Sequence, residues 1–285
     1  MATVPYRKGY TIAPYEISAL GIVTFTDGTN TGIIPNQVQC EAYGYTYDEE
    51  QRVCRAQTFT PKISKAMDNV NNTIRGNNND LGMGINNSIV VGENNSIKGI
   101  SRNNIVVGNA NEIVKGINNS VVLGTLGEVT TENSIVLGAN NTASDILGER
   151  QSIQLIYGRQ TTDNSTVDAY LNNTSGSYFE VPEDSAIYFQ SETLALRVGG
   201  TAGGSVGDFK SWVERGVVLN VGGTLSIDRS RTSPASSGTT TGWSPINSVS
   251  GSNFLQTVKG ATNMTISWVS NIRITQMKPR GGFPS

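Results

Sequence analysis

The chain of 285 residues contains no histidine. Without an imidazole, neither a Ser-His-Asp triad nor a Cys-His pair can be assembled. Hydrolase mechanisms that use either arrangement are therefore excluded. The two cysteines, Cys40 and Cys54, are too few for the roughly four His or Cys ligands that a zinc site commonly needs. We therefore expect no catalytic residues, no cofactor and no metal site.

Charged residues and long apolar runs are also scarce. Asp, Glu, Lys and Arg make up 15% of the chain and the formal net charge is −2, so no basic surface is expected to bind nucleic acid. No stretch approaches the roughly 18 to 20 apolar residues of a membrane helix, and the first ten residues lack the apolar run of a signal peptide. We expect a protein made in the cytoplasm, without membrane insertion. Its two cysteines flank a predicted hairpin and could bridge it after release from the cell, but a reduced pair is the default in a cytoplasmic product.

The hydrophobic share of 36% is below the usual globular value, and 32 glycines together with many Asn, Ser and Thr residues take its place. The polar residues alternate in register with β-branched residues and do not form a featureless tract. This composition predicts an all-β chain with a thin core that is shared with other copies.

A repeat occupies the middle of the chain. Copies of the form Asn-Ser/Asn-Ile/Val-Val-Val/Leu-Gly begin at Asn87, Asn103, Asn119 and Asn133, with spacings of 16, 16 and 14 residues. Each copy has room for a short strand and a Gly or Asn corner, which predicts a parallel β-roll over residues 71–150 whose coils stack Ile over Ile and Asn over Asn. The alternative is a low-complexity, Asn-rich linker, and the spacing, which is kept through three full copies, argues against it. With the half-copies between them, the residues expected in the repeat core are Ile89, Ile97, Ile105, Ile113, Val121 and Ile135.

The NSIVVG and NSVVLG units resemble the head repeats of trimeric autotransporter adhesins, over roughly residues 71–143. In that family the NSVAIG-type motif winds a left-handed parallel β-roll in each of three associated chains. The resemblance implies an intertwined homotrimer. This sequence has no signal peptide, heptad stalk or C-terminal membrane anchor of that family, and the same repeats occur in phage fibres, which suit a cytoplasmically made chain better.

From about residue 151 the period changes to longer strands separated by Gly, Ser and Thr. The clearest is 264–276, where apolar and polar residues alternate as in a half-buried strand. We expect an antiparallel β-sandwich over residues 151–285, with 234–241 as an exposed loop. The expected strands are 152–157, 185–198, 209–221, 224–229, 254–259 and 264–276.

Three segments of this region, 195–200, 210–217 and 262–269, resemble a β-domain at the C-termini of phage tail and fibre proteins. That family has a "W-E-x-x-G-x-I-K-R" strand and a closing "T-N-I-R-W-V-A" strand. Here the middle segment, KSWVERGV, lacks the closing basic pair, whereas the last, TNMTISWV, is a close match. The resemblance implies a structural role, with the loops 172–178 and 232–243 available to bind a host-surface glycan or protein.

Residues 1–70 are expected to form a small β-unit that contains a hairpin around the polar turn 48–51. Tyr43, Tyr45 and Tyr47 would share one face of it. They serve either to pack this unit or as a docking face for another virion protein. A short helix over 62–69 would lead to the β-roll. The resemblance to phage fibres implies that this N-terminal unit is the anchor on the virion.

Together these features predict a structural component of a phage virion, a trimeric head fibre, tail fibre or vertex spike that attaches to the host or decorates the capsid. Three identical tips would add weak contacts through effective concentration. A polysaccharide-degrading spike would instead need two carboxylates about 5 to 10 Å apart, and a bacterial surface adhesin would need a route of secretion. The acidic residues that lie closest to one another along the chain form two groups, Glu180 with Glu183 and Asp184, and Asp145 with Glu149.

Overall fold

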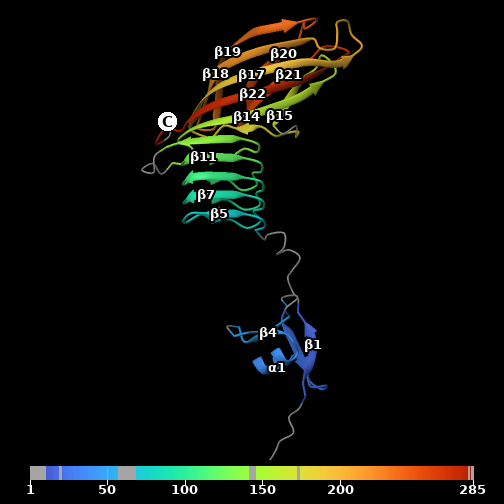
Figure 1. The fold of residues 1–285 in the computed structure, drawn as a ribbon, viewed down its shortest axis with the longest axis vertical. Helices are drawn as coiled ribbons and strands as arrows, with labels where there is room; N and C mark the ends of the chain where they lie inside the picture. Colours follow the sequence, from blue (N-terminus) through green and yellow to red (C-terminus); the bar gives the residue numbers. More distant parts are fainter. Residues whose placement is uncertain are drawn as a thin grey trace, which may run out of the picture. The chain divides into compact units, whose positions relative to one another are not determined.

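The computed structural model describes residues 11–18, 21–49, 51–56, 69–140, 146–171, 174–281 and 283. The chain forms two compact units, Met1–Ala66 and Met67–Ser285. Within the described residues nearly all regular structure is β, and α1 (Gln37–Ala42) is the single helix (Figure 1). The all-β prediction is confirmed. The helix expected over 62–69 lies outside the described residues except for its last position.

The N-terminal unit consists of two antiparallel strand pairs and α1. Strand β1 (Ala13–Ile17) pairs with β2 (Val23–Thr26), and β3 (Thr46–Asp48) pairs with β4 (Val53–Arg55), which is the hairpin predicted around residues 48–51. The core of this unit is formed by Ile12, Val23, Phe25, Cys40 and Cys54.

Cys40 and Cys54 form a disulfide, so the expectation of a reduced pair is wrong for this structure. Cys40 lies on α1 and Cys54 on β4, and both side chains are fully buried. The packing of α1 against the hairpin brings their Cα atoms to 5.6 Å, within the usual range of a disulfide. Their positions on either side of the predicted hairpin allow such a bridge, and the structure contains it.

The central segment winds into a β-solenoid, visible as the stack of short strands in Figure 1. Its strands pair in parallel on two sides, as the β-roll prediction requires. One side has β5 (Thr73–Arg75), β7 (Ile89–Glu93), β9 (Ile105–Asn109), β11 (Val121–Thr125) and β13 (Ile135–Ala139). The other has β6 (Asp80–Leu81), β8 (Ser96–Ile97), β10 (Glu112–Ile113) and β12 (Glu128–Val129).

The predicted repeat core is correct on only one side of the solenoid. Ile97 and Ile113 on the short strands are fully buried. On the longer strands Ile89, Ile105 and Ile135 are exposed and Val121 is only partly buried, so these four do not form the core of the single chain. Side chains alternate along a strand, and the residue after each of them points inward instead. The buried residues are Val90, Val106, Val122 and Val136.

The corners of the solenoid explain the Asn and Gly of the repeat. Asn87, Asn103 and Asn119 have φ angles of 52°, 55° and 54°, in the left-handed region that Asn tolerates better than most residues. Gly108 has a φ of +131°, and a Cβ there would lie 1.9 Å from the carbonyl oxygen of Gly124 in the next coil. Only glycine fits at this approach of two coils.

An asparagine ladder connects successive coils through the partly buried Asn79 and the buried Asn95 and Asn111. Asn95 donates from Nδ2 to Oδ1 of Asn79 at 3.0 Å, and Asn111 donates in the same way to Asn95 at 3.1 Å. Each side chain also donates to the carbonyl of a repeat glycine, for example Asn111 to Gly124 at 2.8 Å. The predicted stacking of Asn over Asn is therefore present, and it satisfies backbone groups that the corners leave unpaired.

The C-terminal part is a two-layered antiparallel sandwich, as predicted (Figure 1). Its larger sheet continues the solenoid, because β14 pairs with β13 on one side and with β22 on the other. In spatial order it contains β14 (Arg150–Thr161), β22 (Met264–Met277), β17 (Ser185–Gly200), β18 (Phe209–Val221) and β19 (Thr224–Ser237). The second layer contains β15 (Thr166–Leu171), β16 (Phe179–Glu180), β20 (Ser244–Ser250) and β21 (Asn253–Lys259).

All six strands expected from the sequence are present, with two differences. Strand β19 extends to Ser237, so 234–237 belongs to a strand and not to the predicted loop. Strands β15, β16 and β20 were not predicted. Between the layers lie large aromatic side chains, including the stacked pair Trp212 and Trp268 with ring centroids 5.7 Å apart.

Candidate assembly face and polar sites

The larger sheet leaves a broad apolar face uncovered in the single chain. On the solenoid this face has two rows of side chains in parallel register, one through Ile89, Ile105, Val121 and Ile135 and the other through Val91, Val107, Leu123 and Leu137. Six of these eight side chains are 37 to 48% exposed. Along each strand these residues alternate with the buried valines, so their side chains point away from the core.

The register of the two rows continues onto the C-terminal sheet, but the first positions reached there are polar: Gln154 and Arg273 follow Ile135, and Ser152 and Thr275 follow Leu137. Leu137 is the Cα partner of Ser152, which pairs with Thr275, and Thr275 pairs with Tyr188. The exposed apolar side chains of the continuation are Ile156, Tyr188, Leu194, Leu196, Val198, Phe209, Val217, Leu219, Val221, Val269 and Met277. We call the two rows and this continuation the outer sheet face. Monomeric proteins seldom leave so large an apolar surface exposed, so this face is a candidate for association with another chain.

A polar band crosses the outer sheet face. Gln190 is the Cα partner of Arg215 on one side and of Arg273 on the other. Both arginines are exposed, and within the described residues neither has a hydrogen-bond or ion-pair partner. Gln190 donates to Glu192 at 2.9 Å. Charges within an apolar contact surface favour one alignment of two partners over others, so this band is suited to set the register of association.

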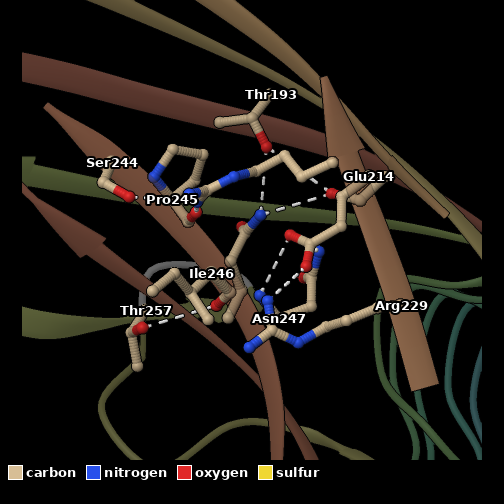
Figure 2. A network of polar contacts seen from close by, with 11 residues as sticks. Thr193, Glu214, Arg229, Ser244, Pro245, Ile246, Asn247 and Thr257 are labelled. Atoms are coloured by element: carbon tan, nitrogen blue, oxygen red, sulfur yellow. Dashed lines mark hydrogen bonds and ion pairs between the residues drawn. The ribbon is translucent and has the colours of Figure 1, made fainter. Parts of the chain in front are cut away.

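A buried polar network joins the two layers of the sandwich (Figure 2). Glu214 on β18 is 2% exposed, and its Oε1 accepts from Arg229 at 2.7 Å while Oε2 accepts from Asn247 Nδ2 at 3.0 Å. Beside it, Gln256 donates to Thr193 at 3.1 Å. Oε1 thus bonds to the neighbouring strand β19 of the same sheet, and Oε2 bonds across the core to β20 in the second layer. Because both carboxylate oxygens are occupied, this network stabilises the packing of the layers.

A second buried ion pair shapes the glycine-rich loop between β17 and β18. Arg197 is 2% exposed and lies 3.7 Å from the Asp208 carboxylate. Asp208 in turn accepts from the backbone N–H groups of Ser205 and Thr239 at 3.0 and 3.2 Å. The guanidinium donates to four loop carbonyls, those of Gly199, Gly200, Ala202 and Gly203. Arg197 thus replaces the missing backbone partners of this loop.

The carboxylates singled out in the sequence do not form one cluster. Glu149 is 8% exposed and pairs with Arg280 at 3.2 Å, whereas Asp145 lies outside the described residues. Asp184 accepts from the backbone N–H of Gly222 at 3.2 Å. Glu180 and Glu183 are exposed and line a pocket of about 230 Å³ together with Glu128 from the last solenoid coil. Sequence reasoning missed Glu128, which lies more than fifty residues away.

We call this cavity the base pocket. Strand β12 in the last solenoid coil supplies Glu128, and Lys278 directly follows β22. Lys278 forms an ion pair with Glu128. The full lining is Glu128, Thr130, Glu180, Val181, Pro182, Glu183, Asn220, Gly223, Ser252 and Lys278.

The three tyrosines of the N-terminal unit pack largely on its own core. Tyr43 donates to the carbonyl of Ile12 at 2.7 Å, and its ring lies edge-on to Phe25 at 5.4 Å. Tyr45 and Tyr47 are partly buried against the same core. This arrangement favours the packing role, and docking through Tyr43, Tyr45 and Tyr47 stays a prediction.

Neither a metal centre nor a membrane-spanning helix is found within the described residues. No group of three His, Cys, Asp or Glu side chains there is arranged to hold a metal ion. No helix in that part of the chain has the length and apolar character needed to cross a membrane.

No protein-family model matches the sequence, and no curated protein matches it significantly. Among solved structures the chain is similar to three phage tailspikes. The Acinetobacter baumannii phage AM24 tailspike is 9% identical with a TM-score of 0.26, over 73% of this chain and 55% of that one. The Acinetobacter phage vB_ApiP_P1 tailspike is 11% identical with a TM-score of 0.22, over 74% and 54%. Gp49 of A. baumannii phage Fri1, described as a capsular polysaccharide depolymerase, is 9% identical with a TM-score of 0.24, over 66% and 49%. The chain thus spans about half the length of the tailspikes it matches.

Proposed function

We propose that this chain is a non-enzymatic structural subunit of a bacteriophage spike or fibre, which assembles as a homotrimer and contacts a glycan or protein of the host surface. The observation that carries the proposal is the outer sheet face, an apolar surface that runs from the solenoid across the sandwich. A chain with such a face is built to associate.

The size of this face supports association of identical chains. Burying a Val, Leu or Ile side chain completely contributes about 1.5 to 3 kcal/mol. The side chains of the outer sheet face are already about half covered, so each would add roughly 1 kcal/mol in a complex. Seventeen of them are exposed apolar residues, which together exceed the roughly 4 to 15 kcal/mol that association costs in lost freedom. Three copies, rather than two, follow from the resemblance of the repeats to trimeric β-rolls.

The assignment to a phage particle is supported by the resemblance of residues 195–200, 210–217 and 262–269 to phage tail and fibre domains. In this proposal residues 1–70 attach the trimer to other virion proteins, and the sandwich faces the host. Head fibre, tail fibre and vertex spike share this arrangement, as does a fibre that decorates the capsid.

A polysaccharide-degrading spike is the second candidate, because Glu180 and Glu183 line one pocket with Glu128. We favour binding over hydrolysis because Glu128 is already paired with Lys278, and Glu214 and Glu149 are committed to structural contacts. A surface adhesin is the third candidate, on the repeats alone.

An adsorption assay separates these candidates. Purified full-length chain should slow adsorption of the phage that encodes it, and immunogold labelling should place the chain on the particle. Shortening of the host's surface polysaccharide during incubation would favour the degrading spike. Export of the intact chain to a bacterial surface without phage genes would contradict the fibre.

A further inference from the structure

We propose that the copies of the homotrimer meet in one specific alignment, in which the Ile row of one copy faces the Val/Leu row of the next and Arg215 of one copy forms an ion pair with Asp228 of the next. This inference rests on the proposed function, because it specifies which parts of the outer sheet face touch. The Ile row comprises Ile89, Ile105, Val121 and Ile135, and the Val/Leu row comprises Val91, Val107, Leu123 and Leu137.

The polar residues beside the two rows favour this alignment on the solenoid. On β9, Ile105 and Val107 lie about 6.6 Å apart at a rise of roughly 3.3 Å per residue, and the next positions outward are Asn103 and Asn109. In a ring of three copies, a residue on one side of the axis meets a residue from the other side of the next copy. An axis along the Ile row would set Val107 against Asn103, and an axis along the Val/Leu row would set Ile105 against Asn109. An axis between the rows sets apolar side chains against apolar side chains.

On the sandwich the two rows extend into residues of opposite charge. The register of the Ile row continues through Arg273 and Arg215. The register of the Val/Leu row continues through Tyr188 and reaches Asp228 on β19. Asp228 is exposed and, like the two arginines, has no ion-pair partner within the described part of the chain. One extension therefore carries two unpaired positive charges, and the other carries an unpaired negative charge and an aromatic ring.

The proposed alignment brings these groups together. Arg215 and Asp228 lie on the neighbouring strands β18 and β19, whose spacing of about 4.8 Å an arginine side chain spans. In the same way Arg273 on β22 meets Tyr188 on the neighbouring strand β17, whose exposed ring can bind a guanidinium group. An axis along the Ile row would instead gather two arginines from each of three copies, and burying unpaired charges is costly.

Glu192 is the competing partner for the two arginines. It lies on the other side of the Ile row, two residues after Gln190 on β17, and accepts from Gln190 at 2.9 Å. An axis that brought the arginines to Glu192 of the next copy would set the Ile row of the solenoid against the corner asparagines, such as Asn103. The apolar rows and the charges agree only when the Ile row faces the Val/Leu row.

Disulfide trapping in the full-length chain tests the alignment. Ile105→Cys and Val107→Cys are made as separate variants with different affinity tags, and both sites are exposed in the single chain. Cys40 and Cys54 are already joined to each other, so they contribute no free thiol. After co-expression and oxidation the two variants should form covalent mixed dimers, because their rows face each other. Each variant expressed alone should stay free of crosslinks.

Charge reversal tests the ion pair by light scattering. Arg215→Asp or Asp228→Arg alone should raise the concentration at which half of the chains are trimeric by at least about tenfold. The double variant, which exchanges the two charges, should restore the wild-type value. Lys259→Asp is the matched control, because this exposed residue lies on β21 in the second layer, and it should leave the trimer unchanged.

Three results would overturn the inference while the proposed homotrimer stands. They are crosslinking of Ile105→Cys with itself, a trimeric preparation without mixed crosslinks, and a double charge variant that associates no better than the single ones. A wild-type chain that remains monomeric would instead contradict the proposed function, and the alignment with it.

Discussion

Replacing Asn111 by alanine removes one member of the asparagine ladder while leaving the outer surface of the solenoid unchanged. Asn111 is 1% exposed. Its Nδ2 donates to the carbonyl of Gly124 at 2.8 Å, and its Oδ1 accepts from the N–H of Gly127 at 2.8 Å. Asn95 Oδ1 would keep the backbone N–H of residue 111 as a donor at 3.1 Å, so two backbone groups lose their side-chain partner.

The expected loss of stability follows from these two groups. Each buried backbone group left unpaired costs about 1 to 3 kcal/mol, so Asn111→Ala should lower the free energy of unfolding by roughly 2 to 6 kcal/mol. That is a large fraction of the roughly 5 to 15 kcal/mol of a typical domain. The matched control is Asn109→Ala, which removes a half-buried amide whose Oδ1 accepts from Asn94 at 3.2 Å and from no other described residue. Its effect should stay within about 0.5 kcal/mol.

The assay is urea unfolding of the full chain followed by far-ultraviolet circular dichroism, at one protein concentration because association adds to apparent stability. Hydrogen exchange of residues 96–127 should report local opening in the Asn111 variant. Equal unfolding midpoints for Asn111→Ala and Asn109→Ala would refute the reasoning, because the ladder would then contribute nothing to the stacking of coils.

Two further substitutions and the reduction of the disulfide test other parts of the fold. Gly108→Ala should destabilise the solenoid much more than Gly116→Ala in parallel urea titrations. Both glycines have a positive φ, but only at Gly108 would the new Cβ meet a backbone oxygen, at 1.9 Å. Equal effects of the two substitutions would show that the coils can separate without cost. Tyr157→Phe should cost about 1 to 3 kcal/mol by the same titration, because the phenol accepts from Phe179 N–H at 2.9 Å and donates to the Phe254 carbonyl at 3.2 Å. Burial raises the pKa of the Tyr157 phenol above its ordinary value of 10.0. The stability that the phenol contributes should therefore be complete below pH 10.0 and decline at higher pH. A loss of this stability already at neutral pH would contradict the expected direction. Reduction of the Cys40–Cys54 disulfide, whose sequence separation is 14, should lower the free energy of unfolding of the N-terminal unit by about 3 kcal/mol. Proteolysis within residues 11–56 should then be faster, while cleavage of the sandwich stays unchanged. Equal proteolysis of the reduced and oxidised chains would exclude a stabilising role.

The periodicity of the sequence was sufficient to predict the solenoid, because Asn and Gly recur where the backbone must take a positive φ. It was not sufficient to decide which of two adjacent β-branched residues points inward. Ile89 and Val90 are both suited to a strand, and only the pairing of the coils buries Val90. The strands missed in the sandwich have a similar cause, since β20 contains Pro245 and polar residues that resemble a loop.

The candidate sites were less predictable than the fold. Glu128, Asn220 and Lys278 meet at the base pocket from distant parts of the chain, so no spacing in the sequence indicates it. Glu180 and Glu183 could be singled out because they are close in sequence. The positions of Cys40 and Cys54 around the hairpin left both a bridge and a reduced pair open, and only the packing of α1 against the hairpin shows the bridge.

The most direct test of the central claim is light scattering of the purified full chain over a range of concentrations. The proposed assembly predicts a mass of three times 30.4 kDa. Leu123→Glu, which puts a charge into the outer sheet face, should shift the measured mass toward that of the monomer. Lys115→Glu, at an exposed solenoid corner, should leave the trimer intact. A wild-type chain that remains at 30.4 kDa and unfolds cooperatively would contradict association through this face.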